Sequence, residues 1–346
     1  MSAQKKSLKY VIIGDGHAGN SAAETLRKGS PGSDIVIVST KPTHYFDHSL
    51  LATFLLDKKD ITSLYVYPYT WYKDNNIRLR LNQTVTKVIP DKHELILSHN
   101  EHVYYDRLLI ASGAKPKLPE SLSRYKSLLT VFTDAVDAMK LRERLGSVKH
   151  VTMVGGDCIG LHLAGAMLKL GKSVTFVLNE YNFWPLEFDE TVKGKLIGCL
   201  KKKHIEVIAD DLTTEIVKDG TGLNVLTKNG KIVKTDLAFL TSGMVPNIDF
   251  LDGSGIDVQT GILVDEYMHT SAQDIWAAGE CATVYYPELK DYRQTTGEIN
   301  AKALGNISAR NMLDEKKVVS LAEPGKITIE GEDFITYGWK GFSIDI

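Results

Sequence analysis

The residues that most clearly suggest chemistry are three glycines near the start of the chain, spaced as Gly14-x-Gly16-x-x-Gly19. In a dinucleotide-binding turn of this spacing, Gly14 makes the tight bend, Gly16 lets the backbone approach a pyrophosphate, and Gly19 lets the helix pack closely on the strand. The pyrophosphate charge is then stabilised at the helix N-terminus. The motif predicts a dinucleotide site if it joins a strand to a helix; otherwise it is only a glycine-rich turn.

The segments around this turn supply the required context. Residues 9–13 form a continuous apolar run of strand length, residues 20–28 carry apolar residues on one helical face, and residues 34–39 form a second apolar run. Continuous apolar runs are typical of strands that are buried in a parallel sheet. The order predicts a βαβ unit of about 30 residues, with the glycines at its first turn.

An acidic residue that binds the ribose usually stands about 20 residues after such a turn. Ser39, Thr40 and Lys41 stand at that point in this chain. A hydroxyl can still bond to a ribose, and Lys41 can approach a phosphate. The alternative is that these three residues are simply a strand end that faces solvent.

A second glycine-rich turn follows an apolar run at residues 150–154 and reads Gly155-Gly156-Asp157-x-x-Gly160. It predicts a second nucleotide-binding unit, but Asp157 stands where the backbone should approach the pyrophosphate. A carboxylate there adds bulk and negative charge against a phosphate. No arginine follows the next strand to receive a 2′-phosphate, so the pattern favours NAD over NADP and weakens both. The alternative is that this turn is only a structural relic.

Two further motifs complete a family pattern. Residues 110–116 read Ile-Ala-Ser-Gly-Ala-Lys-Pro, and residues 274–281 read Asp-Ile-Trp-Ala-Ala-Gly-Glu-Cys. With these motifs the chain resembles the FAD/NAD(P)-dependent pyridine nucleotide-disulfide oxidoreductase superfamily, and most of all its rubredoxin reductase and nitrite reductase flavoprotein branch. The resemblance runs from about Tyr10 to Gly338 and implies FAD as the cofactor, with NAD(H) as a weaker second ligand.

The resemblance also implies which residues bind each cofactor. Ala111-Ser112-Gly113 corresponds to the turn at which the FAD domain passes to the NAD domain, and Glu280 of Gly279-Glu280 to the acid that holds the ribityl chain. The candidate residues for FAD are Gly14, Gly16, His17, Ala18, Gly19, Ser39, Thr40, Lys41, Val85, Ala111, Ser112, Gly113, Gly279 and Glu280, and those for a nicotinamide nucleotide are Gly155, Gly156 and Gly160.

The catalytic candidates are Asp47, His48 and His162. The chain has no cysteine before Cys158, so disulfide reduction by a CxxxxC pair on the first long helix is excluded. The related reductases tend to carry a lysine–glutamate pair, and the matching positions here are Ala52 and His162. A histidine or aspartate near the flavin can act as an acid or base, although a helix start that Asp47 or Ser49 caps explains this segment at least as well.

The predicted fold is α/β, with two doubly wound Rossmann-like nucleotide-binding domains, antiparallel β-meanders and a short C-terminal extension. Residues 1–114 and 245–313 are the predicted FAD-binding domain, residues 115–244 the NAD(P)-type domain, and residues 314–346 a truncated extension. The resemblance implies an interface domain of roughly 80–120 residues in place of this extension. The family-type homodimer is therefore doubtful, and an uncovered flavin face suits the docking of another subunit.

The composition restricts the remaining classes. The 346 residues are 43% hydrophobic and 24% charged, with a net charge of −2, which does not suggest a nucleic-acid-binding protein. No apolar run approaches the roughly 20 residues of a transmembrane helix, and the N-terminus has no secretory signal. Three widely spaced cysteines make no metal site or disulfide framework. These features predict a cytoplasmic protein with no metal.

The predicted function is an FAD-dependent oxidoreductase that transfers electrons between NAD(P)H and a protein or quinone acceptor, without a redox-active disulfide. The alternative is an FAD-carrying electron-transfer subunit of a larger redox complex, with a degenerate nicotinamide site. A third reading is a non-enzymatic interaction or sensing protein on a decayed scaffold. In the first two, a protein partner or other subunits of a complex are expected.

Overall fold

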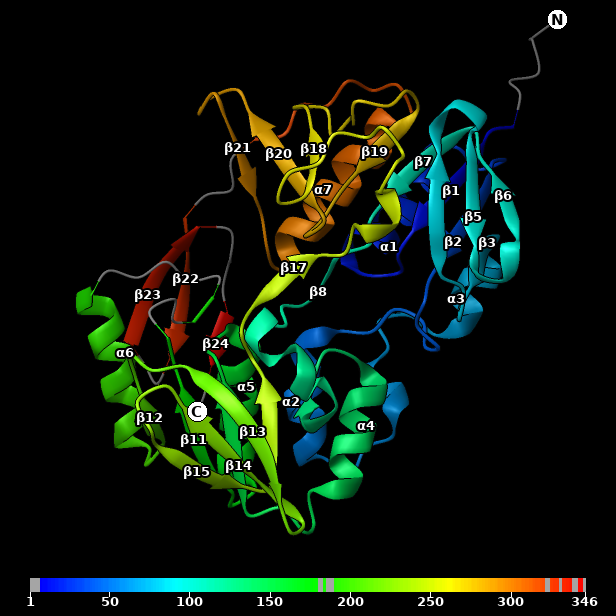
Figure 1. Cartoon of the computed structure of the whole chain (residues 1–346). Helices are drawn as coiled ribbons and strands as arrows, with labels where there is room; N and C mark the ends of the chain where they lie inside the picture. The colour runs from blue at the N-terminus through cyan, green and yellow to red at the C-terminus, as the bar shows by residue number, and fades with distance from the viewer. Residues whose placement is uncertain are drawn as a thin grey trace, which may run out of the picture. The chain divides into compact units, whose positions relative to one another are not determined.

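The computed structural model describes residues 7–179, 183–184, 190–320, 324–329, 332–337 and 342–344. The chain divides into two compact units (Figure 1). The first unit contains residues 1–46, 65–115 and 245–323, and the second contains residues 47–64, 116–244 and 324–346. Each unit is built on its own parallel sheet.

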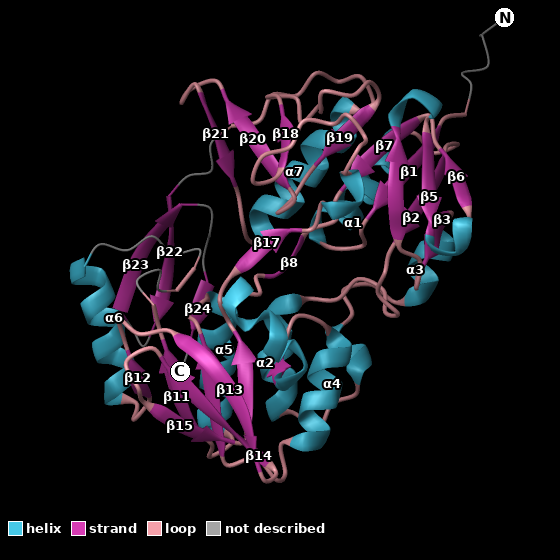
Figure 2. Cartoon of the chain, in the orientation of Figure 1, coloured by secondary structure: helices cyan, strands magenta, loops and turns pink. Residues whose placement is uncertain are grey.

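The first unit is organised around a five-stranded parallel sheet in the order β19-β7-β1-β2-β3 (Figure 2). Its strands are β1 (Lys9–Ile13), β2 (Asp34–Val38), β3 (Ile77–Arg80), β7 (Arg107–Ile110) and β19 (Ile275–Ala277). The strand order reverses beside β1, whose neighbours are β2 on one side and β7 on the other. Ligands of open α/β sheets bind at such a reversal, beyond the carboxyl ends of the strands.

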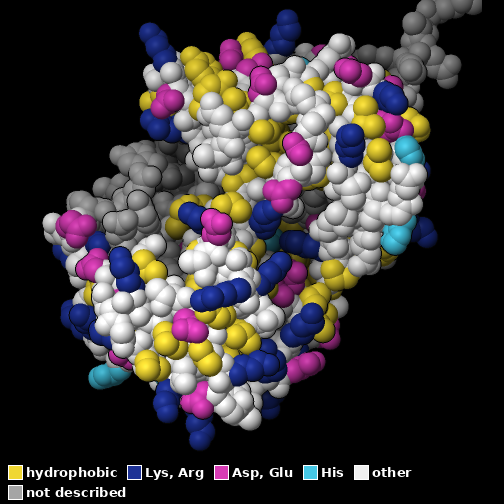
Figure 3. Space-filling model, viewed as in Figure 1, with side chains coloured by type: hydrophobic (Ala, Val, Ile, Leu, Met, Phe, Trp, Pro, Cys, Tyr) yellow, Lys and Arg dark blue, Asp and Glu magenta, His cyan; other side chains and the backbone are white. Residues whose placement is uncertain are grey.

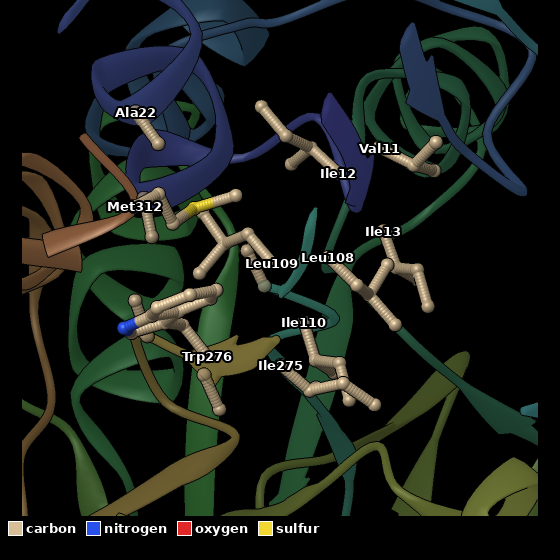
Figure 4. Close-up of a cluster of buried hydrophobic side chains, with 14 of the residues drawn as sticks. Val11, Ile12, Ile13, Ala22, Leu108, Leu109, Ile110, Ile275, Trp276 and Met312 are labelled. Atoms are coloured by element: carbon tan, nitrogen blue, oxygen red, sulfur yellow. The ribbon is translucent and has the colours of Figure 1, made fainter. Parts of the chain in front are cut away.

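The apolar runs of these strands form the core of the unit. Ile12 of β1, Leu109 of β7 and Ile275 of β19 are each fully buried, and they lie together in the cluster drawn in Figure 4. Trp276 and Met312 belong to the same cluster. A parallel sheet that is covered on both faces requires continuous apolar strands, which is why these segments could be found from the sequence.

Two helices of the first unit pack against each other, α1 (His17–Gly29) and α7 (Glu298–Asn311). A Cβ on Gly305 would overlap the backbone of Ala18, so the two helices approach backbone to backbone at this point. The Ser21 hydroxyl donates to the Lys302 carbonyl at 2.8 Å across the same contact. The close packing fixes the start of α1 against the C-terminal part of the unit.

The rest of the first unit consists of small antiparallel and mixed sheets and short helices. One sheet joins β4 (Val85–Ile89), β5 (Glu94–Leu97) and β6 (His102–Tyr104), another joins β18 (Ile262–Val264), β20 (Ala282–Tyr286) and β21 (Asp291–Gln294), and the helices are α3 (Tyr69–Asp74) and the 3-10 turns η3 (Pro90–Lys92), η4 (Ser98–Asn100) and η6 (Asp249–Leu251).

The second unit repeats the parallel plan, with a five-stranded sheet in the order β12-β11-β10-β16-β9. Its strands are β9 (Leu129–Thr130), β10 (His150–Val154), β11 (Ser173–Val177), β12 (Glu206–Ile208) and β16 (Leu237–Leu240), and its helices are α4 (Ala135–Arg144), α5 (Cys158–Lys169) and α6 (Glu190–Lys202). An antiparallel sheet joins β13 (Thr213–Asp219), β14 (Gly222–Thr227) and β15 (Ile232–Thr235), and a further small sheet joins β22 (Pro324–Ile329), β23 (Glu332–Tyr337) and β24 (Phe342–Ile344).

The segment at residues 47–64 belongs to the second unit, although the sequence assigns it to the FAD-binding domain. It contains η1 (His48–Leu50), α2 (Leu51–Leu56) and η2 (Ile61–Leu64). Helix α2 packs against α4 and α5, and the Arg142 guanidinium lies 3.9 Å from the centre of the Phe54 ring. This non-local packing determines where the segment belongs.

After residues 47–64, the chain enters the second unit again in β8 (Ala114–Pro116) and returns in β17 (Met244–Pro246), and these two strands pair with each other. The 3-10 helix η5 (Glu120–Leu128) follows β8. The predicted α/β class, with two parallel sheets and smaller antiparallel ones, is confirmed. The strand predicted at residues 34–39 ends at Val38, and the first helix begins at His17 rather than at residue 20.

The surface carries both signs of charge. Lys and Arg side chains are interspersed with Asp and Glu on the face that Figure 3 shows, in line with the net charge of −2. None of the helices that the structure describes is long and apolar enough to cross a membrane.

Candidate functional site

The glycine-rich turn of the first unit joins β1 to α1. A Cβ on Gly14 would overlap the Ala111 carbonyl, and one on Gly19 would overlap the Gly14 carbonyl. Gly14 also has a φ of +106°, a conformation that favours glycine. Gly16 differs from both, because a Cβ there would meet no described heavy atom within 4 Å. The fold itself therefore requires Gly14 and Gly19, whereas Gly16 faces open space, as a pyrophosphate site needs.

Helix α1 begins at this turn, and no side chain caps it: Gly16 is the N-cap residue. Backbone N–H groups in the first turn of a helix point toward its N-terminus and favour an anion. His17 lies beside them, with its Nδ1 at 2.7 Å from the Tyr45 hydroxyl and 3.8 Å from the Glu298 carboxylate. The start of α1 is suited to a phosphate group of a nucleotide.

Asp15 lies inside the same turn and is 4% exposed. Its Oδ1 accepts a hydrogen bond from the Ser39 hydroxyl at 2.7 Å, and its backbone carbonyl accepts one from the Asn20 amide at 2.6 Å. Its Oδ2 is buried and has no hydrogen-bond partner among the described residues. Burial raises the pKa of the Asp15 carboxyl, and the positive charge of Lys41 opposes this rise. The sequence analysis did not single out Asp15.

Lys41 is the charged group that the two acids of this site share. It opposes the burial-driven rise in the pKa of Asp15 and also that of Glu280. Its Nζ lies 4.7 Å from the centre of the Phe46 ring. Thr40 is exposed, whereas Ser39 is buried against Asp15. Of the three residues that follow β2, Ser39 and Lys41 therefore interact with the glycine-rich turn.

The turn at residues 111–113 packs directly on the glycine-rich turn through Ala111. Gly113 has a φ of +66°, and the Ser112 hydroxyl donates to the Asn247 carbonyl at 2.8 Å. The predicted cofactor residue Val85 is 5% exposed and is a member of the hydrophobic core cluster. The structure thus brings Ala111 to the glycine-rich turn and assigns Val85 a packing role.

Gly279 and Glu280 reach the same site from the end of β19. A Cβ on Gly279 would lie 3.1 Å from the Cβ of Ala18 in α1, which places this motif against the start of the helix. The Glu280 carboxylate accepts a hydrogen bond from the backbone N–H of Gly297 at 3.3 Å. Burial raises the pKa of Glu280. An acid held in this way has a second oxygen that can accept hydrogen bonds from hydroxyl groups.

The glycine-rich turn of the second unit has the same framework. Gly155 has a φ of +101°, and a Cβ on it would lie 2.7 Å from the Thr241 carbonyl oxygen. A Cβ on Gly160 would lie 3.0 Å from the Thr241 side chain. A Cβ on Gly156 would lie 2.8 Å from a methyl group of Leu178 and 3.0 Å from the backbone nitrogen of Phe183. The fold therefore requires a glycine at Gly155, and the space at Gly156 and Gly160 is tight.

Asp157 caps α5. Its Oδ1 accepts the N–H of Gly160 at 2.7 Å, and its Oδ2 accepts the N–H of Gly243 at 3.1 Å. The side chain is 3% exposed, and burial raises its pKa to about 6. The carboxylate thus occupies the helix N-terminus itself. The sequence analysis predicted the opposition to a phosphate, but not the hydrogen bond to Gly243.

Trp184 covers the same turn through its backbone. Its N–H donates to the Gly156 carbonyl at 3.0 Å, and its carbonyl accepts the N–H of Cys158 at 3.1 Å. The Cys158 and Gly160 N–H groups, which begin α5, are therefore both bonded to protein oxygens. The start of α5 differs in this respect from the start of α1, which has no side-chain cap.

The three catalytic candidates lie in the second unit. Asp47 caps η1, since its Oδ1 accepts both the N–H and the hydroxyl of Ser49, at 2.9 and 2.7 Å. His48 is exposed. The Nδ1 of His162 lies 3.1 Å from the Cys158 carbonyl, and burial lowers the pKa of His162 to about 4. His162 is therefore neutral near pH 7.

Cys158, Cys199 and Cys281 are free thiols, and all three are buried. The Sγ of Cys281 donates to the carbonyls of Ile110 and Ala278 at 3.4 and 3.3 Å. Burial raises the pKa of both Cys158 and Cys281, which keeps these thiols protonated. Within the described part of the chain, no group of three or more His, Cys, Asp or Glu side chains is placed to hold a metal ion.

Residues 8–300 match the family described as Pyridine nucleotide-disulphide oxidoreductase. The chain is 30% identical over 279 residues to nitrite reductase (NAD(P)H) of Bacillus subtilis (strain 168), a match that covers 80% of this chain and 34% of that protein. It is 26% identical over 304 residues to the 3-phenylpropionate/cinnamic acid dioxygenase ferredoxin--NAD(+) reductase component of Photorhabdus laumondii, covering 88% of this chain and 77% of the relative. The chain thus spans about a third of the first relative and three quarters of the second.

Solved structures share the fold. The covalent putidaredoxin reductase-putidaredoxin complex matches with a TM-score of 0.85 at 23% identity, covering 92% of this chain and 78% of the other. The ferredoxin reductase for the CYP199A2 system from Rhodopseudomonas palustris matches with a TM-score of 0.83 at 22% identity, covering 90% of this chain and 78% of that chain. The two-sheet architecture is therefore a known one, and the match from residue 8 to residue 300 includes both glycine-rich turns.

Proposed function

The chain belongs to the pyridine nucleotide-disulphide oxidoreductase family, and we propose that it is an FAD-dependent oxidoreductase that takes electrons from NAD(P)H and delivers them to a protein acceptor. The observation that carries this proposal is the turn at the start of α1, where Gly16 faces open space and no side chain caps the helix. When bound, FAD supplies the step between two-electron donors and one-electron acceptors.

The residues around this turn fit FAD. The N–H groups at the start of α1 would hold the pyrophosphate, and Lys41 would add a positive charge beside it. Glu280, fixed by the Gly297 N–H, would accept hydrogen bonds from the ribityl hydroxyls. The buried Asp15 oxygen without a described partner also fits a ligand that bears hydroxyl groups. The contacts of Ala111 and Gly279 with Gly14 and Ala18 bring these parts together.

A protein acceptor is supported by the relatives. One is named as a ferredoxin--NAD(+) reductase component, one as an NADH-rubredoxin oxidoreductase of Clostridium acetobutylicum, at 27% identity over 300 residues, and one solved structure is a complex with putidaredoxin. We extend this preference for small redox proteins to the present chain. No redox-active disulfide takes part in the proposed reaction, which is consistent with three buried free thiols.

Asp47, His48 and His162 remain the candidates for proton handling. Asp47 and His162 already have assigned contacts, to Ser49 and to the Cys158 carbonyl. With its pKa near 4, His162 is neutral at pH 7 and would be only a weak base there. Substituting each residue and measuring the pH dependence of turnover would separate a proton-handling role from a structural one.

The second candidate function is that of an FAD-carrying electron-transfer subunit whose nicotinamide site does not work. The bonds at the start of α5 favour it, because Asp157 and Trp184 already accept the N–H groups that a pyrophosphate would use. A nucleotide would have to displace these bonds and approach a buried carboxylate. NADH binding should therefore be weak, and electrons would come mainly from a partner.

One experiment separates these functions. The purified 346-residue chain is examined for a flavin spectrum and then mixed anaerobically with NADH or NADPH in a stopped-flow instrument. Rapid bleaching at low micromolar NADH, followed by reduction of an added ferredoxin or rubredoxin, supports the first function. A flavin that bleaches only with dithionite supports the second. A colourless chain that does not take up added FAD contradicts both.

A further inference from the structure

Asp15 has one carboxylate oxygen that the described residues leave without a hydrogen-bond partner. The side chain is 4% exposed, and its Oδ1 is bonded to the Ser39 hydroxyl at 2.7 Å, whereas Oδ2 is buried and unsatisfied. Buried polar atoms in folded proteins are almost always hydrogen-bonded, because an unmade bond costs free energy. An unsatisfied buried oxygen inside a glycine-rich turn therefore points to a donor that comes with the ligand.

The chemistry of a carboxylate narrows the type of group that faces Oδ2. An ionised carboxylate only accepts hydrogen bonds. A pyrophosphate at neutral pH likewise carries acceptor oxygens and negative charge, so it cannot satisfy Oδ2. A hydroxyl group can donate, and the sugar hydroxyls of a dinucleotide are the hydroxyl donors available near such a turn.

The position of Asp15 agrees with the sugar of the adenosine half. Dinucleotide folds carry the acid that binds this ribose just after the second strand of the βαβ unit. In this chain Ser39 stands there, immediately after β2, and its hydroxyl donates to Asp15. No acid stands at the end of β2. The bond from Ser39 instead holds the carboxylate of Asp15, which belongs to the glycine-rich turn, beside that strand end.

Lys41 offsets part of the cost of burying the Asp15 carboxylate. Its positive charge opposes the effect of burial on Asp15 and on Glu280. It would also partly offset the repulsion between these two acids and a bound pyrophosphate. The arrangement of Asp15, Ser39 and Lys41 therefore combines an acid for a sugar with a cation for the adjoining phosphate.

We propose that Asp15, positioned by Ser39, binds a ribose hydroxyl of the adenosine half of FAD and replaces the acid that is missing after β2. This inference rests on the proposed function, in which FAD is the cofactor. It makes Asp15 a determinant of the preference for FAD over FMN, because FMN has no adenosine. Glu280 would act on the ribityl chain, which both flavins contain.

The test compares the two flavins on the full chain. Wild type, Asp15→Asn and Glu280→Gln are loaded with FAD or FMN, and each dissociation constant is measured from the fluorescence of flavin released on dilution. Asp15→Asn loses a charge-assisted hydrogen bond, so its dissociation constant for FAD should be roughly ten- to a hundredfold higher than that of wild type. Its FMN binding should equal that of wild type, whereas Glu280→Gln should weaken both flavins.

A relocation variant separates ligand binding from a folding effect. Asp15→Ala combined with Ser39→Asp returns a carboxylate to the strand end, and it should recover most of the FAD affinity that Asp15→Ala loses. Equal weakening of FAD and FMN by Asp15→Asn, or no change in either, would overturn the role of Asp15 and leave FAD as the cofactor. A wild-type chain that binds neither flavin would overturn the proposed function as well.

Discussion

The carbonyl of Trp184 accepts the backbone N–H of Cys158, the first residue of α5, at 3.1 Å. The next contact along the helix start is the bond from the Gly160 N–H to Asp157. Helix N-termini attract anions through N–H groups that lack a partner within the helix. Two turns with closely related glycine spacing thus differ in chemistry: side-chain and backbone oxygens of the protein already occupy the second one, whereas no side chain caps the first.

Replacing Gly16 with glutamate should produce a colourless protein. A Cβ at Gly16 meets no described heavy atom within 4 Å, so a side chain can begin there without a clash. It places a negative charge where the pyrophosphate would bind. The measurement is the ratio of flavin to protein absorbance after purification. Gly32→Glu, at a second glycine with open space around it, is the matched control and should retain wild-type FAD content.

Replacing Glu280 with glutamine should weaken FAD retention without unfolding the chain. The amide can keep the bond from the Gly297 N–H, but it loses the charge that strengthens a bond from a hydroxyl group. We expect flavin release on dilution to increase about tenfold, which corresponds to about 1.4 kcal/mol. The exposed Glu288→Gln is the control for loss of a negative charge. Equal retention by both variants would place Glu280 outside the flavin site.

Replacing Asp157 with alanine should destabilise the second unit. The change removes the cap of α5 and leaves the Gly243 N–H without its acceptor. Loss of an N-cap typically costs about 1 kcal/mol, and an unsatisfied buried donor adds about 1–3 kcal/mol. Urea unfolding of the full chain measures this change. Asp157→Ser, which can still cap the helix, should recover part of the loss; identical midpoints for wild type and Asp157→Ala would contradict the cap.

NADH binding should be weak in wild type and should improve only partly when Asp157 is replaced by serine. The serine removes the negative charge, but the Trp184 carbonyl still occupies the Cys158 N–H. We expect a wild-type dissociation constant above the micromolar range. Anaerobic flavin bleaching at a series of NADH concentrations gives this value for both proteins. Saturation of wild type at low micromolar NADH would show that the bonds at the start of α5 yield readily to a nucleotide.

Asp157 and His162 should give opposite pH dependences of stability. The pKa of Asp157 is raised from 3.8 to about 6, so the folded chain binds this proton more tightly and the free energy of unfolding falls as the pH rises through that range. The pKa of His162 is lowered from 6.5 to about 4, so its contribution is lost as the pH falls through that range.

The urea midpoints of Asp157→Asn and His162→Gln between pH 4.5 and pH 7 test these signs. Relative to wild type, Asp157→Asn should rise more steeply with pH in the lower half of this range, and His162→Gln less steeply. Parallel profiles of all three proteins would mean that neither group has a shifted pKa in the folded chain. Holding the ionic strength constant keeps surface charges from contributing to the comparison.

The parallel strands could be predicted because their residues are buried on both faces. The apolar runs at β1 and β10 lie within the bounds that the sequence suggested. Strand β3 was missed, since Arg78 and Arg80 interrupt its apolar pattern and its partner β2 lies about 40 residues earlier. The membership of residues 47–64 in the second unit depends on long-range packing such as that of Phe54 on Arg142, which no local pattern records.

The residues of the candidate sites likewise fall into two groups: some could be predicted from local spacing, and others depend on contacts between distant parts of the chain. Gly14 and Gly19 follow from spacing, because the tight βα turn leaves no room for a Cβ at either position. The role of Asp15 depends on a bond to Ser39, 24 residues later. The sequence did contain a signal for Asp15, because an acid stands inside the turn and the usual acid after β2 is missing. The bond between Asp157 and Gly243 spans 86 residues and could not be inferred from sequence alone.

The burial of Cys158, Cys199 and Cys281 also makes this chain convenient for spectroscopy. Thiol-reactive dyes and spin labels attack exposed thiolates, so the native protein should contribute little background labelling. A single cysteine introduced at an exposed site, such as Thr40 beside the first turn, would then carry the only label. The fluorescence or mobility of that probe would report directly on the arrival of a nucleotide or of a redox partner.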